Sequence, residues 1–97
     1  MRFKILLAPE AIEDLDSLPA HIRSGVREAI ETHLRHEPMK LSKSRIKRLR
    51  GLSSPQYRLR VGEVRVFYDV TEPEVRVVAV VAKSKAVEWL AQFGESK

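Results

Sequence analysis

The segment of residues 57–68 constrains the fold of this chain more than any other part of it. Apolar and polar side chains alternate on both sides of a central glycine, in the order Tyr57-Arg58-Leu59-Arg60-Val61-Gly62-Glu63-Val64-Arg65-Val66-Phe67-Tyr68. A two-residue loop that begins with glycine suits a type II′ turn between antiparallel strands. The loop therefore predicts a hairpin whose register places Val61 opposite Val64 and Arg60 opposite Arg65.

The two faces of the predicted hairpin differ in chemistry. Because side chains alternate along a strand, one face is the predicted core side, formed by Tyr57, Leu59, Val61, Val64, Val66 and Tyr68. The other face carries Arg58, Arg60, Arg65 and Phe67. Like charges that oppose each other destabilise a hairpin by roughly a few tenths of a kcal/mol or more. Guanidinium groups match the geometry of phosphate, so we expect this face to bind an anion rather than to be an ordinary solvated surface.

Basic residues are concentrated in one part of the chain. Residues 1–37 contain five basic and seven acidic side chains, whereas residues 40–65 contain nine basic side chains and one acidic side chain. Such a basic block is the electrostatic pattern expected of a nucleic-acid binder. An acidic protein partner is the alternative. An anionic membrane fits less well, because no basic amphipathic helix accompanies the block.

Length and composition exclude several other classes. A chain of 97 residues is expected to form a single domain over residues 1–97. Cysteine is absent, which excludes disulfides and thiol catalysis and is compatible with a cytoplasmic location. We see neither an apolar run long enough to span a membrane nor a signal-peptide pattern. The three histidines fall in one helical segment without convincing metal-ligand partners, so we expect no metal and no cofactor.

Apolar spacing and proline positions predict the remaining elements. A short strand over residues 2–7 precedes a helix that opens at Pro9, and a second helix opens at Pro19 and is ended by Pro38. A basic connector follows over residues 38–55. The predicted class is α+β, with a small antiparallel sheet, the order β-α-α-β-β-β-α, and a helical hairpin packed on one sheet face.

The strand predicted for residues 75–82 is almost entirely apolar, which indicates burial on both faces at the centre of the sheet. If residues 71–74 form a four-residue loop, Asp69 opposes Arg76 in a favourable cross-strand pair. The same register puts Val81 near Val64, so the end of this strand lies beside the glycine turn of the hairpin. Lys83 and Lys85 follow directly, so we expect them to approach the opposed arginine pair.

A final helix is predicted after residue 84. Ala86, Leu90 and Phe93 recur at helical spacing and are expected to face the protein. Trp89 is adjacent to this stripe, and an apolar packing role is favoured for it over base stacking. We expect the last few residues to be flexible.

In this order of elements the chain resembles the RelE branch of the RelE/ParE toxin superfamily, over essentially its whole length. The resemblance is carried by Lys47-Arg48-Leu49-Arg50-Gly51-Leu52, Tyr57-Arg58-Leu59-Arg60-Val61-Gly62, Val64-Arg65-Val66-Phe67-Tyr68-Asp69-Val70, and the apolar strand with Lys83 and Lys85 behind it. It implies a type II toxin with an antitoxin encoded nearby, joined in a toxin–antitoxin hetero-oligomer. Such toxins typically cleave messenger RNA on the ribosome and so inhibit translation.

The resemblance also implies roles for individual residues. The expected catalytic residues are Arg58, Arg60, Arg65 and Lys85. General contacts to RNA or the ribosome are expected from the basic residues of the connector and the last strand's end, Lys43, Lys47, Arg48, Arg50 and Lys83.

In this chemistry a 2′-hydroxyl attacks the adjacent phosphate, and cations stabilise the crowded phosphate in the transition state. Arginine stays protonated and is a poor general base, so the general acid and base are not identified. The family pattern has a tyrosine near the C-terminus, and this chain has none after Tyr68. Two alternatives therefore stay open: a ParE-like toxin that inhibits DNA gyrase by binding it, and a catalytically degenerate homologue that only binds RNA or antitoxin.

Overall fold

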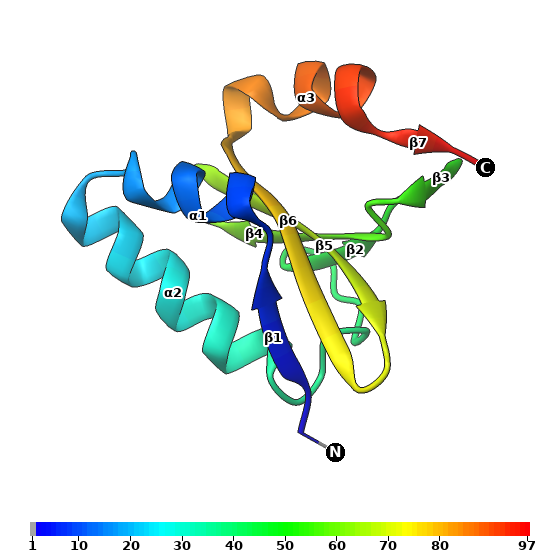
Figure 1. The fold of residues 1–97 in the computed structure, drawn as a ribbon, viewed down its shortest axis with the longest axis horizontal. Coiled ribbons are helices and arrows are strands. Elements are labelled where there is room, and N and C mark those ends of the chain that lie inside the picture. Colours follow the sequence, from blue (N-terminus) through cyan, green and yellow to red (C-terminus); the bar gives the residue numbers. More distant parts are fainter. Residues whose placement is uncertain (1) are drawn as a thin grey trace.

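A five-stranded sheet forms the centre of the molecule (Figure 1). The computed structural model describes residues 2–97, so Met1 of the predicted domain lies outside the described residues. The strand order in the sheet is β1-β6-β5-β4-β2. These strands are β1 Lys4–Leu7, β2 Ile46–Arg48, β4 Tyr57–Val61, β5 Val64–Thr71 and β6 Glu74–Ala82.

Helices lie on both sides of this sheet (Figure 1). The helical hairpin consists of α1 Pro9–Asp16 and α2 Ala20–Leu34, and its buried residues join one continuous core with the strands. A 3-10 turn, η1 Lys83–Lys85, leads into α3 Ala86–Phe93, which packs on the opposite sheet face through Trp89 and Phe67. The predicted α+β class and the packing of the helical hairpin on one face are confirmed. No helix within residues 2–97 is long and apolar enough to cross a membrane.

The central hairpin has the predicted register. Arg60 is the partner of Arg65, and Val61 is the partner of Val64. Gly62 has a φ of 57°, a left-handed conformation that residues with a Cβ atom adopt rarely. The predicted core side is buried: Leu59, Val66 and Tyr68 are all 0% exposed, and the Tyr57 and Tyr68 rings stack at 5.4 Å.

One strand pairing differs from the predicted antiparallel sheet. β1 pairs with β6 in parallel, with Lys4 opposite Glu74 and Leu7 opposite Val77. The sheet is therefore mixed, although its other pairs are antiparallel. The direction of β6 follows from the antiparallel pairs of β2 with β4, β4 with β5 and β5 with β6, and this direction is the same as that of β1.

The basic connector also contains short strands that its sequence did not indicate. β2 is three residues long and pairs with β4. β3, Leu52–Ser54, pairs with β7, Glu95–Ser96, in a separate two-stranded sheet. Elements of two or three residues are too short to produce a detectable hydrophobic period. Two of the last few residues form β7. The predicted flexibility of this segment stays a prediction.

A β-bulge changes the register between β5 and β6. The predicted pair of Asp69 and Arg76 is confirmed, but the connecting turn is shorter than predicted, because Thr71 already pairs with Glu74. Beyond Tyr68 and Phe67 the register shifts by one residue, so Val81 lies opposite Arg65 rather than beside Val64. An extra residue in one strand increases local twist. Here the extra residue is in β6, just past the last residue that pairs with β1.

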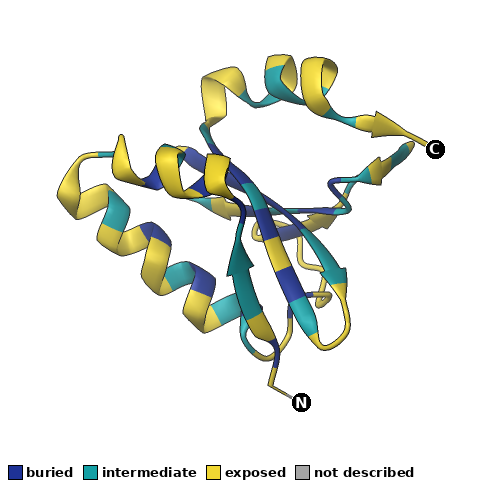
Figure 2. Ribbon diagram, in the orientation of Figure 1, coloured by how far each residue is buried: buried dark blue, intermediate teal, exposed yellow. Residues whose placement is uncertain are grey.

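The final helix is rotated relative to the prediction. Trp89 stacks on Phe67 with ring centroids 5.0 Å apart and an interplanar angle of 8°. Phe93, which was expected to face the protein, is 55% exposed, while Ala86 and Leu90 are half-buried. Figure 2 shows that most of α3 is exposed or half-buried. The large indole ring covers the sheet, whereas Phe93, one turn further along the same helix face, lies beside the indole and stays more than half exposed.

Candidate nucleic-acid interface

Four cationic side chains occupy neighbouring positions on the sheet face away from the helical hairpin. Lys47 of β2 is the partner of Arg58 in β4, and Arg60 of β4 is the partner of Arg65 in β5. Since cross-strand partners share a face, we call Lys47, Arg58, Arg60 and Arg65 the basic ladder. The turn at Gly62 and the pairing of β2 with β4 together create it.

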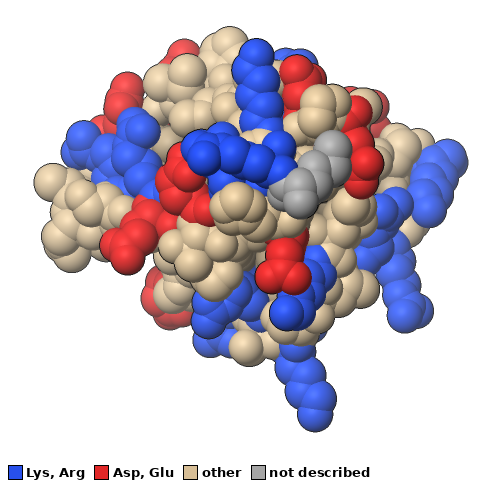
Figure 3. Space-filling view, turned by 90° about the horizontal axis from the view of Figure 1, so that it is seen from below, with Lys and Arg blue, Asp and Glu red and all other residues tan. Residues whose placement is uncertain are grey.

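No acidic side chain neutralises the basic ladder. Within residues 2–97 the ion pairs join Arg35 to Glu31 and Lys40 to Glu37, and none involves the ladder. The surface seen from the end where the chain begins is different, because acidic and basic side chains are intermixed on it (Figure 3). The ladder is therefore an uncompensated cationic surface, which is the charge arrangement that an anionic ligand needs.

Arg58 is the ladder residue whose environment most favours an anion. Burial lowers the pKa of its guanidinium below the ordinary value, and the charges of Arg65 and Arg60 lower it further. Its Nε is buried and has no hydrogen-bond partner among the described residues. An anion bound to the part of this guanidinium that reaches the surface would supply the missing negative charge.

Arg65 is positioned differently from the prediction of a freely accessible anion ligand. Its side chain is buried, with 6% of the residue exposed. Its Nη1 donates to the carbonyl oxygens of Gly62 at 2.8 Å and Val64 at 3.1 Å. These bonds offset part of the repulsion from Arg60 and tie the guanidinium to the turn. This conformation depends on a side-chain rotamer, which strand alternation does not predict. The predicted catalytic role of Arg65 stays a prediction.

Arg60 is the exposed arginine of the ladder. Its backbone N–H donates to the carbonyl oxygen of Arg45 at 2.8 Å, which extends the pairing between β4 and the start of β2. The backbone of Arg60 is thus held by the sheet, whereas its side chain is free of protein partners among the described residues. This combination suits a residue that binds a ligand.

The predicted lysines lie at the hairpin end of the sheet. The backbone N–H of Lys83 donates to the carbonyl oxygen of Glu63 at 2.8 Å, directly at the turn. Lys85 borders a shallow cleft of about 310 Å³ that is also lined by Val81, the strand partner of Arg65. Both lysines are exposed. The structure therefore brings them to the end of the sheet at which the opposed arginines lie.

The connector residues do not all share this face. Lys43 and Arg50 are exposed on either side of β2. Arg48 follows Lys47 and therefore points to the other face of β2, where its guanidinium carbon lies 5.0 Å from the centre of the Tyr57 ring. Its Nη1 donates to the Tyr57 hydroxyl at 3.2 Å. Roles in RNA binding remain predictions for these three basic residues.

Tyr68 and His33, two side chains that carry an exchangeable proton, lie away from the ladder. The Tyr68 hydroxyl is in the core and donates to the carbonyl oxygen of Pro38 at 2.6 Å, and burial strongly raises its pKa. His33 of α2 accepts a hydrogen bond at Nε2 from Arg45 Nη1 at 2.7 Å. Burial, and then the charge of Arg45, lower the pKa of His33. Among the described residues, the ladder face offers cations for phosphate binding and no histidine or tyrosine for proton transfer.

The comparisons with known proteins agree with this fold. The family model described as ParE toxin of the type II toxin-antitoxin system, parDE, matches residues 5–87. The chain is similar to the toxin in the RelB-RelE antitoxin-toxin complex from Methanococcus jannaschii, with 25% identity, a TM-score of 0.67, and coverage of 87% of this chain and 96% of that one.

Two further solved structures show the same fold. For the archaeal RelE-RelB complex from Pyrococcus horikoshii OT3, the identity is 23%, the TM-score 0.71, and the coverage 88% of this chain and 99% of that one. For the YoeB-YefM complex from Staphylococcus aureus, the identity is 18%, the TM-score 0.59, and the coverage 82% of this chain and 95% of that one. None of the curated proteins matches the chain.

Proposed function

The chain belongs to the ParE toxin family of type II toxin-antitoxin systems, within the RelE/ParE superfamily, and on that premise we propose that it is a ribosome-dependent endoribonuclease. In this proposal it cleaves messenger RNA and so inhibits translation. The observation that carries the proposal is the basic ladder, where Arg58, Arg60 and Arg65 gather on one face without a carboxylate among the described residues. A surface that only packed against another protein would have little need of such convergent cations.

The proposed reaction is attack by a 2′-hydroxyl on the neighbouring phosphate. A bond forms between the 2′-oxygen and phosphorus, and the bond from phosphorus to the 5′-oxygen breaks. The products are a cyclic phosphate and a 5′-hydroxyl. The phosphate gains negative charge in the transition state, which the exposed Arg60 and the half-buried guanidinium of Arg58 are suited to stabilise. Lys85 provides a further cation near the same end of the sheet.

Proton transfer supports the ribosome dependence of this proposal. The 2′-hydroxyl must lose a proton and the 5′-oxygen must gain one. The ladder arginines stay protonated at neutral pH and cannot accept the first proton. The two tyrosines are directed to the core side of the sheet. Glu63 at the turn and Glu88 beside Lys85 are exposed surface carboxylates, and we assign the missing proton acceptor to the ribosome-bound complex.

An antitoxin is the second proposed partner. The similar protein from Methanococcus jannaschii was solved as an antitoxin-toxin complex. We propose that this toxin likewise forms a hetero-oligomer with an antitoxin encoded nearby, whose acidic and apolar residues cover the ladder. Charge attraction should speed their association, so the association rate should fall as salt rises. Because ribosomes are the proposed site of action, the proposed location is cytoplasmic.

Two observations favour a second candidate function, the inhibition of DNA gyrase by binding. The matching family model is that of the ParE toxin, and Arg65 is directed to the turn rather than outward. A toxin that acts by binding needs no proton acceptor. A homologue that binds RNA or antitoxin without cleaving is the third possibility.

One parallel experiment separates these functions. Purified toxin is added to translating ribosomes with a defined message, and new message ends are mapped by primer extension; gyrase supercoiling is measured with the same preparation. We expect new ends only in messages that carry ribosomes, and unchanged supercoiling. Intact messages with blocked supercoiling would establish the second candidate. Intact messages with ribosome binding and normal supercoiling would identify a degenerate homologue.

A further inference from the structure

A cleft between α1, β6 and α3 differs in chemistry from the basic ladder. It has a volume of about 560 Å³. Its apolar lining includes Val78 at the bulge of β6, together with Trp89 and Phe93 of α3. The cleft exists because β1 ends at Leu7, so β6 continues past its partner and α1 and α3 flank the part of β6 that does not pair with β1 (Figure 1).

The rim of this cleft is acidic. Four carboxylates line it, against one basic residue, and they come from α1 and from β7: Glu10, Glu13, Asp14 and Glu95. One of these carboxylates has a structural use, because Asp14 Oδ2 accepts the backbone N–H of Val80 at 2.9 Å where β6 lacks a strand partner. Glu10 and Glu13 are exposed and have no ion-pair partner within residues 2–97. The rim is therefore a locally acidic region on a chain whose net charge is +5.

The aromatic side chains of the cleft are only partly covered. Trp89 rests on Phe67 on one side, and the Phe93 ring is 5.4 Å from it, tilted by 38°. Phe93 remains 55% exposed, and none of the residues of α3, all of which are described, is buried. An exposed aromatic side chain beside an apolar cleft marks a surface that a partner covers. Carboxylates and aromatic rings together favour a cationic side chain with an apolar neighbour.

We propose that this cleft binds a segment of the antitoxin in which arginine or lysine side chains alternate with apolar ones. RNA is a poor occupant, because the carboxylates would repel its phosphates. The toxin then has two surfaces of opposite charge: the basic ladder for phosphates and for acidic residues, and the acidic cleft for basic ones. The inference rests on the antitoxin partner of the proposed function and does not depend on the ribonuclease activity.

The only tryptophan of the chain lies in the cleft and serves as the reporter. The probe is a short synthetic peptide of alternating leucine and arginine, and its counterpart contains leucine and glutamate. We expect a saturable change in Trp89 emission with the first peptide and none with the second. The double variant Glu10→Gln/Glu13→Gln should weaken binding about tenfold, because two partly solvated ion pairs are lost.

A matched control changes the same charge elsewhere. Glu28 of α2 and Glu72 of the β5–β6 turn are exposed and do not line the cleft. Glu28→Gln/Glu72→Gln should therefore bind the arginine peptide like the unchanged protein. The antitoxin itself, encoded beside the toxin, should dissociate faster from the cleft variant than from the control variant. Thermal melting of both variants verifies that they are folded.

Several results would overturn the proposal. Equal binding of the glutamate peptide, or equal affinity of the two double variants, would show that the acidic rim does not select the occupant. Self-association of the toxin that the cleft variant abolishes would identify a second copy as the occupant. Because Trp89 emission is read without ribosomes, a toxin that fails to cleave messages can still pass this test, and the two failures are distinguishable.

Discussion

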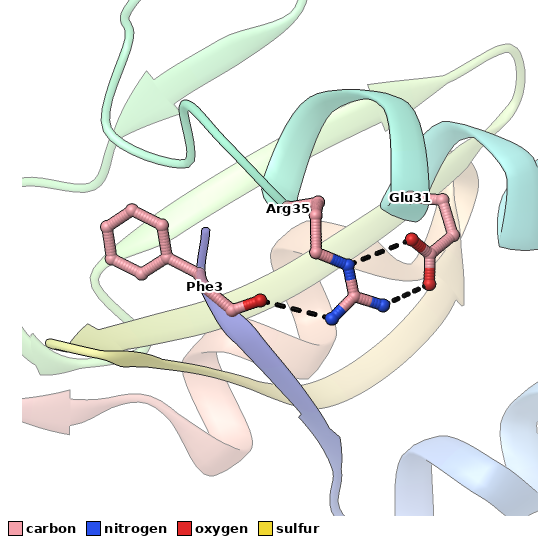
Figure 4. Close-up of polar contacts among 3 residues, drawn as sticks. All are labelled: Phe3, Glu31 and Arg35. Carbon is pink, nitrogen blue, oxygen red and sulfur yellow. Dashed lines mark hydrogen bonds and ion pairs between the residues drawn. The ribbon is translucent and has the colours of Figure 1, made fainter. Parts of the chain in front are cut away.

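Arginine has two opposite uses in this molecule, and the contrast lies in its partners. Arg35, at the end of α2, is held by Glu31 through Nε at 3.0 Å and through Nη2, while its Nη1 donates to the Phe3 carbonyl oxygen at 3.0 Å (Figure 4). The hydrogen bond to Glu31 raises the pKa of Arg35. Burial lowers the pKa of Arg58, which has no such partner.

The difference distinguishes an arginine with a structural role from one that is available to bind a ligand. Arg35 joins α2 to the chain just before β1, and each of its three side-chain nitrogens donates to the protein. The arginines of the ladder share a face with one another, and among the described residues their charges have no acidic partner. Arg65 lies between these two extremes, because carbonyl oxygens accept its hydrogen bonds but no carboxylate balances its charge. Four predictions test this division.

The largest effect is expected from Arg60→Ala. This change removes an exposed cation that makes no side-chain contact to the protein, so the melting temperature should change little. Loss of one transition-state donor should lower cleavage of ribosome-bound messages by about 10²-fold. Arg27→Ala is the matched control, since Arg27 is exposed on α2 and lies away from the ladder. Equal cleavage by both variants would remove Arg60 from the proposed site.

Arg65→Ala should affect stability and cleavage together. The carbonyl oxygen of Val64 would lose a buried donor, and a buried group left without a partner costs about 1–3 kcal/mol, whereas the carbonyl oxygen of the exposed Gly62 would be left to water. Relief of the repulsion from Arg60 offsets part of this loss. Denaturant unfolding measures the change, and cleavage is compared per folded molecule. Unchanged stability would mean that the guanidinium is not held by the turn. Normal cleavage per folded molecule would make Arg65 purely structural.

Arg35→Ala should lower stability and leave cleavage unchanged, which is the reverse of the result expected for Arg60→Ala, and the effect should be smaller. The bond to the Phe3 carbonyl oxygen and the pair with Glu31 are lost. Since the pair is largely solvated, the loss in unfolding free energy should be smaller than that of Arg65→Ala. Cleavage per folded molecule should not change. A selective loss of cleavage by this variant would contradict the separation into structural and ligand-binding arginines.

The smallest effect concerns pH and the neutral His33 that accepts a hydrogen bond from Arg45. The pKa of His33 is lowered in the folded protein, so the unfolded chain takes up the proton first as the pH falls through about 6.5. The stabilising contribution is therefore present above that pH and is lost as the pH falls through the folded pKa. Unfolding free energies measured across this range should show the loss, and His33→Gln should remove this part of the slope. An unchanged slope in the variant would exclude the proposed linkage.

Part of the architecture was predictable because it depends on local rules. The glycine turn set the hairpin register, and period-2 alternation separated Leu59 and Val66 from the arginines. Counting residues across the second turn predicted the pair of Asp69 and Arg76. The parallel pairing of β1 with β6 was not predictable in this way, since it joins segments that are far apart in the sequence.

Turn chemistry and strand alternation act between near neighbours, so they were enough to predict that Arg58, Arg60 and Arg65 share one face. The place of Lys47 on that face and the contacts of each cation depend on the folded molecule. The bulge in β6 placed Val81 opposite Arg65, the packing of α3 covered Phe67 with Trp89, and a rotamer turned Arg65 to the carbonyl oxygens of its own turn. Burial and hydrogen bonding of a side chain depend on every element packed around it, and a one-dimensional pattern does not contain that information.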